Sequence, residues 1–400
     1  MTQVTSAPSL SALLSPRETL FSLASAIASV TIVGAGLSLT MPLLALRLDE
    51  QGFSARAIGF NATAGGLAVF LGAAAVPGLA RWLGLKRLLV LAILVSCFSL
   101  LSFVWTQNYW AWLVIRAYFA AALCVLFVTS EYWINALAPP RQRGFVLGFY
   151  ATSLSAGFAA GPMILGFTGT AGNLPFYAGM ALFALAAAPI VMWSGKAPEI
   201  ETAPRVGLLA VLANVPLAAF AGLLHGAIET ASLGLLPVYA LRAGESPETG
   251  ALLVTLFALG NVVFQLPTGF VSDHMHRRKL LAWLAALSLF GAVGLALAGP
   301  RHILFFCCLL VLWGGAAGSL YAVGLAHLGS HYSGADLAGA NAAFIMLYAL
   351  GMLAGPPIVG FGMDLASPNG MFFTMAALLA LYLILVWRTG VRLKALRFLG

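Results

Sequence analysis

The chain has 400 residues, of which 61% are hydrophobic and only 8% are charged, and its formal net charge is +8. About a quarter of the residues in a soluble globular protein are charged. The composition therefore excludes a soluble domain and indicates a polytopic membrane protein, and the basic excess is assigned below to membrane topology rather than to a nucleic-acid partner.

Twelve apolar stretches are long enough to cross a membrane as helices. In chain order they lie near residues 20–46, 57–80, 88–106, 109–137, 144–168, 174–194, 208–240, 249–271, 280–299, 302–329, 337–363 and 370–388. The first stretch follows a polar, Ser-rich segment and is too long for the apolar part of a cleavable signal peptide, so we expect it to remain as a span.

The longest connection between the spans lies in mid-chain and separates six spans from six. We therefore predict a six-helix half at 1–195, a cytoplasmic linker at 196–206 and a second six-helix half at 207–400. All four cysteines lie inside apolar stretches and lack metal-ligand spacing, so we predict no metal and no cofactor.

The distribution of Lys and Arg sets the orientation of the spans. With the N-terminus in the cytoplasm, the cytoplasmic segments hold 15 of the 20 basic residues and the other side holds four. We therefore expect a multi-pass protein of the cell membrane, most consistent with a bacterial inner membrane, with both termini cytoplasmic.

The two halves carry an internal repeat. MPLLALR at 41–47 matches LPVYALR at 236–242, an offset of 195, and AGFAAGPMILGF at 156–167 matches LGMLAGPPIVGF at 350–361, an offset of 194. Two matches at nearly one offset indicate six helices duplicated in parallel topology. This architecture is typical of secondary transporters with a substrate site near the midplane between the halves.

Over essentially its whole length the chain resembles the major facilitator superfamily. The family's loop after the second span is G-x-L-x-D-[RK]-x-G-[RK]-[RK]. The second-half copy, GFVSDHMHRRK at 269–279, keeps the first glycine, the acid and the basic pair, with His276 in place of a glycine. The first-half copy, PGLARWLGLKRLL at 77–89, keeps Gly84 and Lys86 but has Arg81 in the place of the acid. The segments TMPLLALRL, SEYWINALAPPRQRG and GPMILGF also resemble a poorly characterised bacterial branch of single-chain facilitators.

The resemblance implies a cytoplasmic gate that locks neighbouring helices. In the second half, Asp273, Arg277 and Arg278 would form it. In the first half the positions of acid and base would be reversed: the acid, Glu131, lies on the fourth span and would face basic residues that follow the second span. These bases are Arg81, Lys86 and Arg87. The alternative is that the basic residues only enforce topology.

A glycine motif of the fifth span, G-x-x-x-G-P, also resembles the family's antiporter signature. It occurs in both halves, as Gly157, Gly161 and Pro162 and as Gly351, Gly355 and Pro356. Glycines four residues apart allow close helix approach in a membrane. The motif is either a sealing and hinging surface, which the family associates with exporters, or ordinary tight packing.

Ionisable residues inside the spans are the main functional candidates, because charge in the bilayer is costly and marks cavities or partners. They are Arg116, Glu131, His225, Glu229 and His327. All five fall on the fourth, seventh and tenth spans, which in the family line the central cavity. Other polar residues, such as Tyr321, are more commonly interhelical hydrogen-bond partners.

His225 and Glu229 lie one helical turn apart and share a face of the seventh span. A histidine that titrates near neutral pH beside a carboxylate suits proton exchange, whereas the alternative is a pair that pins this helix to a neighbour. The offset of 195 aligns them with Val30 and Gly34, so the repeated scaffold does not require them. Arg47 and Arg242, by contrast, occur in both halves and are interpreted as structural ends of the first and seventh spans.

These observations predict an all-α major facilitator fold that works by alternating access. We expect a monomer in the lipid bilayer that exports a small, partly apolar organic molecule in exchange for protons, an antiporter, with Glu229, His225, Arg116 and His327 in the cavity. The alternative is an importer or uniporter of a small anionic solute, with Arg116 as its counter-charge. No Walker A loop, metal-ligand cluster or soluble domain occurs in the sequence, so we expect no enzymatic activity.

Overall fold

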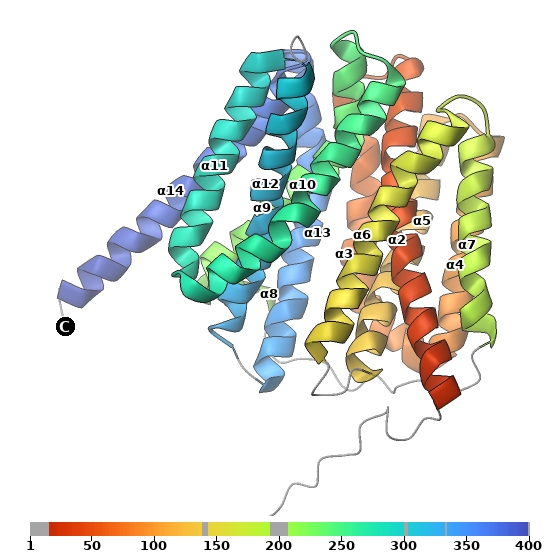
Figure 1. Ribbon diagram of the computed structural model, residues 1–400, viewed down its shortest axis with the longest axis horizontal. Helices are drawn as coiled ribbons and strands as arrows, with labels where there is room; N and C mark the ends of the chain where they lie inside the picture. The colour runs from red at the N-terminus through yellow and green to blue at the C-terminus, as the bar shows by residue number, and fades with distance from the viewer. Residues whose placement is uncertain (1–15, 138–142, 193–206, 300–302, 333, 399–400) are drawn as a thin grey trace, which may run out of the picture. The chain divides into compact units, whose positions relative to one another are not determined.

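The structure is a computed structural model that describes residues 16–137, 143–192, 207–299, 303–332 and 334–398. These residues form twelve long helices and one short one, and no strand occurs among them (Figure 1). The first six are α2 (Pro16–Glu50), α3 (Ala55–Leu83), α4 (Leu85–Trp105), α5 (Tyr109–Leu137), α6 (Arg143–Thr168) and α7 (Leu174–Met192). The remaining helices are α8 (Leu208–Asn214), α9 (Pro216–Arg242), α10 (Pro247–His274), α11 (Arg277–Ala298), α12 (Ile303–Gly329), α13 (Gly334–Leu365) and α14 (Gly370–Phe398).

The twelve long helices correspond one to one with the twelve predicted spans, which confirms the all-α class. In the described part of the chain, ten helices are long and apolar enough to cross a membrane. The other two long helices are α3 and α6. Large apolar side chains such as Phe167, Phe290 and Trp387 are exposed, as expected for helices that face lipid.

One predicted span is wrong in detail, because residues 208–240 do not form a continuous helix. The chain leaves helical conformation at Val215, where φ is −133° and ψ is 58°, and α9 begins at Pro216. Proline disfavours the helical conformation of the residue before it and has no N–H to donate, so it suits the first turn of a helix. The seventh span is therefore α9 alone, preceded by the short α8.

The chain forms two compact units. Unit 1 contains Met1–Thr40 and Leu71–Glu201, and unit 2 contains Met41–Phe70 and Thr202–Gly400. In unit 1, α4 packs against α5 and α7; in unit 2, α9 packs most extensively against α13, and α12 against α10 and α11 (Figure 1). The predicted halves, 1–195 and 207–400, stay a prediction, and the units differ from them by assigning Met41–Phe70 to the second.

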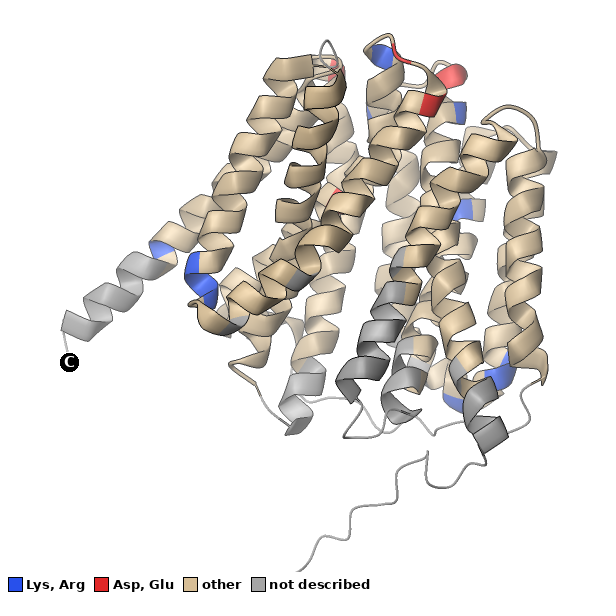
Figure 2. Ribbon diagram, viewed as in Figure 1, with Lys and Arg blue, Asp and Glu red and all other residues tan. Residues whose placement is uncertain are grey.

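Most Lys, Arg, Asp and Glu positions of the described residues lie near the ends of the helices, and a few lie part-way along them (Figure 2). At one end, Lys86 Nζ donates to the carbonyl of Val191, 2.8 Å away, in unit 1. At the same predicted cytoplasmic side, Arg278 Nη2 donates to the carbonyl of Val386 on α14, 2.6 Å away, in unit 2. These side chains thus bind backbone carbonyls of neighbouring helices, at the end of α7 and within α14.

The repeated glycine motif packs helices together inside each unit. In unit 1, a Cβ on Gly157 would strike the carbonyl of Thr31, and one on Gly161 would strike Ser38, so α6 lies directly on α2. In unit 2, a Cβ on Gly351 would strike the carbonyl of Leu223, and one on Gly355 would lie 2.5 Å from the carbonyl oxygen of Ala227. Pro162 and Pro356 continue the respective helices. Both copies of the motif therefore bring the fifth span of a half against the first.

Candidate functional site

The candidate site is centred on one face of α9. His225 and Glu229 point to each other there, with 3.5 Å between His225 Nε2 and Glu229 Oε2. His225 is 6% exposed and the Glu229 side chain is 15% exposed. The seventh span thus carries a nearly buried, directly paired histidine and carboxylate, as its spacing predicts.

A third group joins this pair from α13. Tyr348 Oη donates a hydrogen bond to Glu229 Oε2, with 2.5 Å between the two oxygens. The approach depends on Gly226, because a Cβ at that position would strike the backbone carbonyl of Tyr348. One missing side chain on α9 therefore allows α13 close enough for the phenol of Tyr348 to reach the carboxylate.

Aromatic rings enclose the imidazole of His225. Tyr348 stacks on it at 5.8 Å between ring centroids with an interplanar angle of 26°, and Tyr321 of α12 lies at 5.3 Å. Tyr321 also contacts Tyr348 edge-on at 5.5 Å and Phe344 at 5.0 Å. The site is thus formed by α9, α12 and α13, all in unit 2.

The hydrogen-bond partners of His225 indicate which of its ring nitrogens carries a proton. Nδ1 lies 3.4 Å from the carbonyl oxygen of Ala317, and a carbonyl only accepts, so this contact assigns a proton to Nδ1. In the neutral imidazole, Nε2 then presents a lone pair to Glu229. A lone pair and a carboxylate oxygen bind each other only through a proton between them. The 3.5 Å contact between His225 Nε2 and Glu229 Oε2 is therefore a hydrogen bond when one further proton lies on either atom.

The same positions in the first half carry no ionisable group. The offset of 195 pairs His225 with Val30, Glu229 with Gly34 and Tyr321 with Leu126, and the offset of 194 pairs Tyr348 with Leu154. At Gly34 there is no room for any side chain, because a Cβ would lie 2.6 Å from the carbonyl oxygen of Leu154. The equivalent positions therefore serve helix packing in the first half and carry ionisable side chains in the second half.

Arg116, another predicted cavity residue, lies on α5 in unit 1 and is 5% exposed. It belongs to a different compact unit from the His225–Glu229–Tyr348 cluster. It remains a candidate for a buried cation that faces a substrate.

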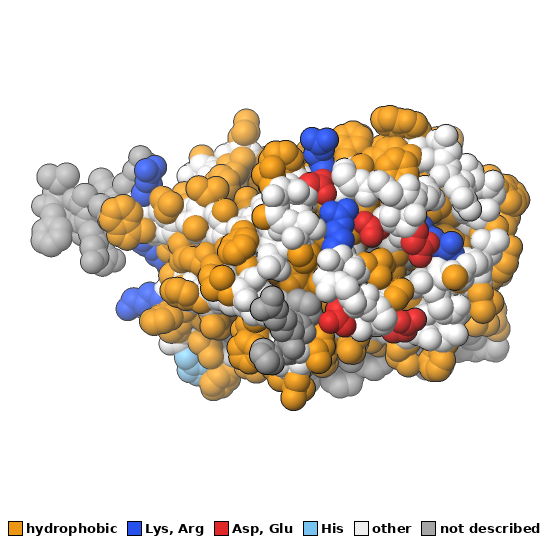
Figure 3. Space-filling view, turned by 90° about the horizontal axis from the view of Figure 1, so that it is seen from above, with side chains coloured by type: hydrophobic (Ala, Val, Ile, Leu, Met, Phe, Trp, Pro, Cys, Tyr) orange, Lys and Arg blue, Asp and Glu red, His pale blue; other side chains and the backbone are white. Residues whose placement is uncertain are grey.

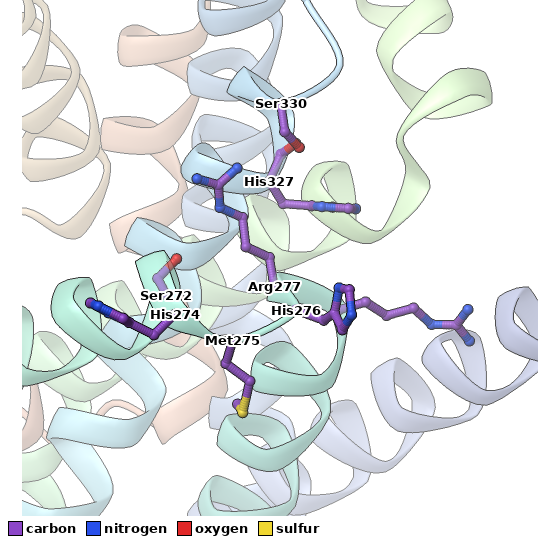
Figure 4. Close-up of a pocket in the computed structure, with 8 residues that line it drawn as sticks. Ser272, His274, Met275, His276, Arg277, His327 and Ser330 are labelled. Carbon is purple, nitrogen blue, oxygen red and sulfur yellow. The ribbon is translucent and has the colours of Figure 1, made fainter.

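His327 does not join the α9 cluster and lies instead beside a cavity of about 510 Å³ at the end of unit 2 where α10 meets α11 (Figure 4). The cavity is lined by Ser272, His274, Met275, His276, Arg277, Arg278, His327 and Ser330. The ring of His327 contacts that of His331 at 4.7 Å. His327 therefore shares its surroundings with Arg277 and Arg278 of the predicted cytoplasmic gate.

The remaining gate residues are placed only in part. Arg81 and Arg87 are exposed at the ends of α3 and α4 in unit 1. The side chains of Glu131 and Asp273 lie outside the described residues. The predicted pairing of these acids with the basic residues stays a prediction. Within the described residues, no group of three or more His, Cys, Asp or Glu is placed to hold a metal ion.

Sequence reasoning missed Tyr348, and two patterns point to it. Tyr348 lies three residues before Gly351, so it shares the helix face of the glycine motif that packs on α9. The repeat comparison that singles out Glu229 also singles out Tyr348, because its counterpart is Leu154.

Comparisons with known proteins agree with this architecture. The chain is 28% identical over 373 residues to an uncharacterised MFS-type transporter of Bacillus subtilis, YfkF, and the match covers 89% of this chain and 93% of that one. Its fold is similar to a bacterial homologue of the human lysosomal transporter Spinster, with a TM-score of 0.74 at 13% identity over 93% of this chain and 96% of that one. It is also similar to a D-xylose–proton symporter, with a TM-score of 0.73 at 16% identity over 92% and 96% of the two chains.

The family model of the Major Facilitator Superfamily matches residues 26–246 and 218–397, which is nearly the whole chain. The matched ranges include α9, the α12 and α13 residues around His225, and both glycine motifs. The twelve long helices, the internal repeat and this match together lead to one conclusion: the chain belongs to the major facilitator superfamily of membrane transporters.

Proposed function

We propose that this protein is a proton-coupled secondary transporter in which Glu229 carries the proton. The observation that carries the proposal is the geometry around Glu229, whose carboxylate lies 3.5 Å from His225 Nε2 and 2.5 Å from Tyr348 Oη. A nearly buried acid with a titratable neighbour suits proton uptake and release within a membrane. The D-xylose–proton symporter among the similar structures is by its name proton-coupled, which supports this use of the fold.

In the proposed cycle, the carboxylate of Glu229 takes a proton from the side of higher proton concentration. The neutral acid is cheaper to move through a low-dielectric region than the carboxylate. His225 Nε2 accepts the proton when the carboxylate releases it and then gives it to water on the side of lower proton concentration, while the phenol of Tyr348 stabilises the ionised carboxylate by donating to it. Alternating access of the two halves would expose this pair to one side of the membrane at a time.

The proposed substrate is a small, partly apolar organic molecule, because the partly exposed Tyr321 and Tyr348 place aromatic rings beside the ionisable pair. The proposed direction is export, as an antiporter in a bacterial inner membrane with both termini in the cytoplasm. This direction rests on the family resemblance of the G-x-x-x-G-P motif, and the orientation rests on the distribution of basic residues. We propose that a monomer carries out the cycle.

Replacement of Glu229 by Gln tests the proton role. The amide keeps the size of the side chain and can accept from Tyr348, but it does not titrate. In proteoliposomes with an imposed pH gradient, a substrate panel should show that Glu229→Gln loses gradient-driven transport. Glu248→Gln, which removes an acid from the exposed first turn of α10, should behave as wild type. Unchanged gradient-driven transport by a folded Glu229→Gln protein would refute the assignment.

A second function is favoured by the burial of Arg116. A cation that is 5% exposed in a membrane-spanning helix suits recognition of an anionic solute by an importer or uniporter. In this case Arg116→Gln would abolish uptake of the anion, and collapse of the pH gradient by a protonophore would leave wild-type transport intact. Loss of transport on collapse of the gradient would favour the proton-coupled function instead.

A further inference from the structure

Three charged side chains form an ion-pair network at the predicted outer end of unit 2. Arg242, the last residue of α9, donates from Nη2 to Asp49 Oδ1 at 3.1 Å and from Nη1 to Asp364 Oδ1 at 3.0 Å. The three side chains are 18–26% exposed. Figure 3, which looks onto this end, shows acidic and basic side chains next to one another. One guanidinium therefore joins the end of α2 to the end of α13.

Asp364 also holds the first turn of α3. Its Oδ1 accepts from the backbone N–H of Ala55 at 2.9 Å, and its Oδ2 accepts from that of Arg56 at 2.8 Å. The first N–H groups of a helix have no partner within the helix and carry partial positive charge. A carboxylate from α13 thus satisfies two of these groups and neutralises the start of α3.

Below this network, α3 lies directly on α13. A Cβ on Gly59 would strike the carbonyl of Pro356, and one on Gly66 would lie 2.6 Å from the backbone nitrogen of Leu353. Thr63 Oγ1 donates to the carbonyl of Leu353 at 3.0 Å. Residues 41–70 come from the predicted first half, yet they belong to unit 2. Opening of the outer side would have to separate this surface.

The repeat shows that the scaffold does not require the two acids. The offset of 195 pairs Asp49 with Gly244, and the offset of 194 pairs Asp364 with Thr170, whereas Arg242 is paired with Arg47. The interpretation of Arg242 as only a structural helix end is therefore incomplete. The two acids that pair with Arg242 have no acidic counterparts at the equivalent positions of the repeat. These two acids, which the equivalent positions lack, are a specific addition to this end of the molecule.

We propose that Asp49, Arg242 and Asp364 form an outer latch, which holds the outer ends of α2 and α3 against α9 and α13 and opens once in each transport cycle. The proposal rests on alternating access and not on the proton role of Glu229. Its test measures opening without substrate, so its failure is distinguishable from failure of proton coupling.

Thr63 provides the reporter, because it faces α13 in the closed arrangement. Thr63→Cys is introduced into protein whose four native cysteines are replaced by Ser, and labelling by a membrane-impermeant maleimide is followed from the outer side. Arg242→Gln and Asp364→Asn should each raise the labelling rate about three- to tenfold, as expected for the loss of one or two partly exposed ion pairs. Equal labelling of these variants and their parent would overturn the latch.

Arg56→Gln is the matched control, because Arg56 is an exposed arginine of the same end that contacts Asp364 through its backbone N–H. Its labelling rate should stay at the parental value. In a second variant, Asp49→Cys with Arg242→Cys, a reducible bifunctional thiol reagent long enough to span the replaced ion pair should cross-link the two positions and stop transport until a reductant is added. Continued transport with that cross-link intact would equally refute the proposal.

Discussion

Tyr348 and Glu229 lie 119 positions apart in the sequence, and the phenol of Tyr348 donates to the carboxylate of Glu229 across 2.5 Å. The contact joins α13 to α9 where Gly226 allows the two backbones to approach closely. A hydrogen bond to a carboxylate favours its ionised form. The proton affinity of Glu229 is thus set by two helices rather than by its own helix alone.

Tyr348→Phe should change the pH dependence of transport and leave the fold intact. Phenylalanine keeps the ring that stacks on His225 but removes the donor to Glu229. Since the ionised carboxylate loses a stabilising bond, Glu229 should take up its proton at higher pH. We expect the pH at half-maximal transport to rise by about one unit. The measurement is transport rate against pH in proteoliposomes.

Tyr239→Phe is the control for this shift. The hydroxyl of Tyr239 donates to Asn369 Oδ1 at 3.2 Å. Tyr239 lies in the same unit as Glu229 but ten residues further along α9. The pH profile of this variant should match that of wild type. A common shift in both variants would mean that the effect is a general consequence of losing a tyrosine hydroxyl.

Gly226→Ala and Gly234→Ala should have opposite effects on stability, although both lie inside α9. At Gly226 a Cβ would strike the carbonyl of Tyr348, whereas at Gly234 it would meet open space. Overpacking at the first position should cost about 1–3 kcal/mol. At the second, alanine should be neutral or stabilise by about 0.5–1 kcal/mol, since glycine is a poor helix former. Thermal unfolding in one detergent measures both, and equal effects would contradict the described packing.

Arg278→Ala should destabilise unit 2 more than Lys279→Ala does. Arg278 Nη2 donates to the carbonyl of Val386 at 2.6 Å and so fastens α11 to α14. A hydrogen bond from a charged group contributes about 1.5–3 kcal/mol. Lys279 is the neighbouring, exposed cation, and its loss should change stability by no more than about 0.5 kcal/mol. Thermal unfolding of the two purified variants tests this difference, which a purely topological role of Arg278 would not produce.

The number and order of the spans could be predicted because length and apolarity determine whether a helix crosses a membrane. The break before α9 was missed because residues 208–240 are apolar on both sides of Pro216, so hydropathy alone does not separate α8 from α9. Pro216 disfavours helical conformation at the residue before it, but it was not a decisive signal, because other prolines of the chain, such as Pro237 and Pro267, lie inside continuous helices.

Pairing within one helix could be predicted, whereas pairing between helices could not. The spacing of four placed His225 against Glu229, because i and i+4 share a helix face. The contacts of Arg242 with Asp49 and Asp364 form because the ends of three helices lie at the same level along the membrane normal. No local sequence pattern predicts that level. For the same reason the sequence did not predict that His327 lies with Arg277 and Arg278 around the cavity near the end of α12, and its place in the substrate cavity stays a prediction.

Gly34 has a consequence for the stoichiometry of any coupled ion. A duplicated chain has two equivalent places for an acid, yet at Gly34 even a methyl group would collide with the backbone of α6. A second carboxylate could not be engineered there by a single substitution, because α2 and α6 would first have to move apart. The tight seam between those helices thus limits how many charges a redesigned version of this transporter could move in each turnover.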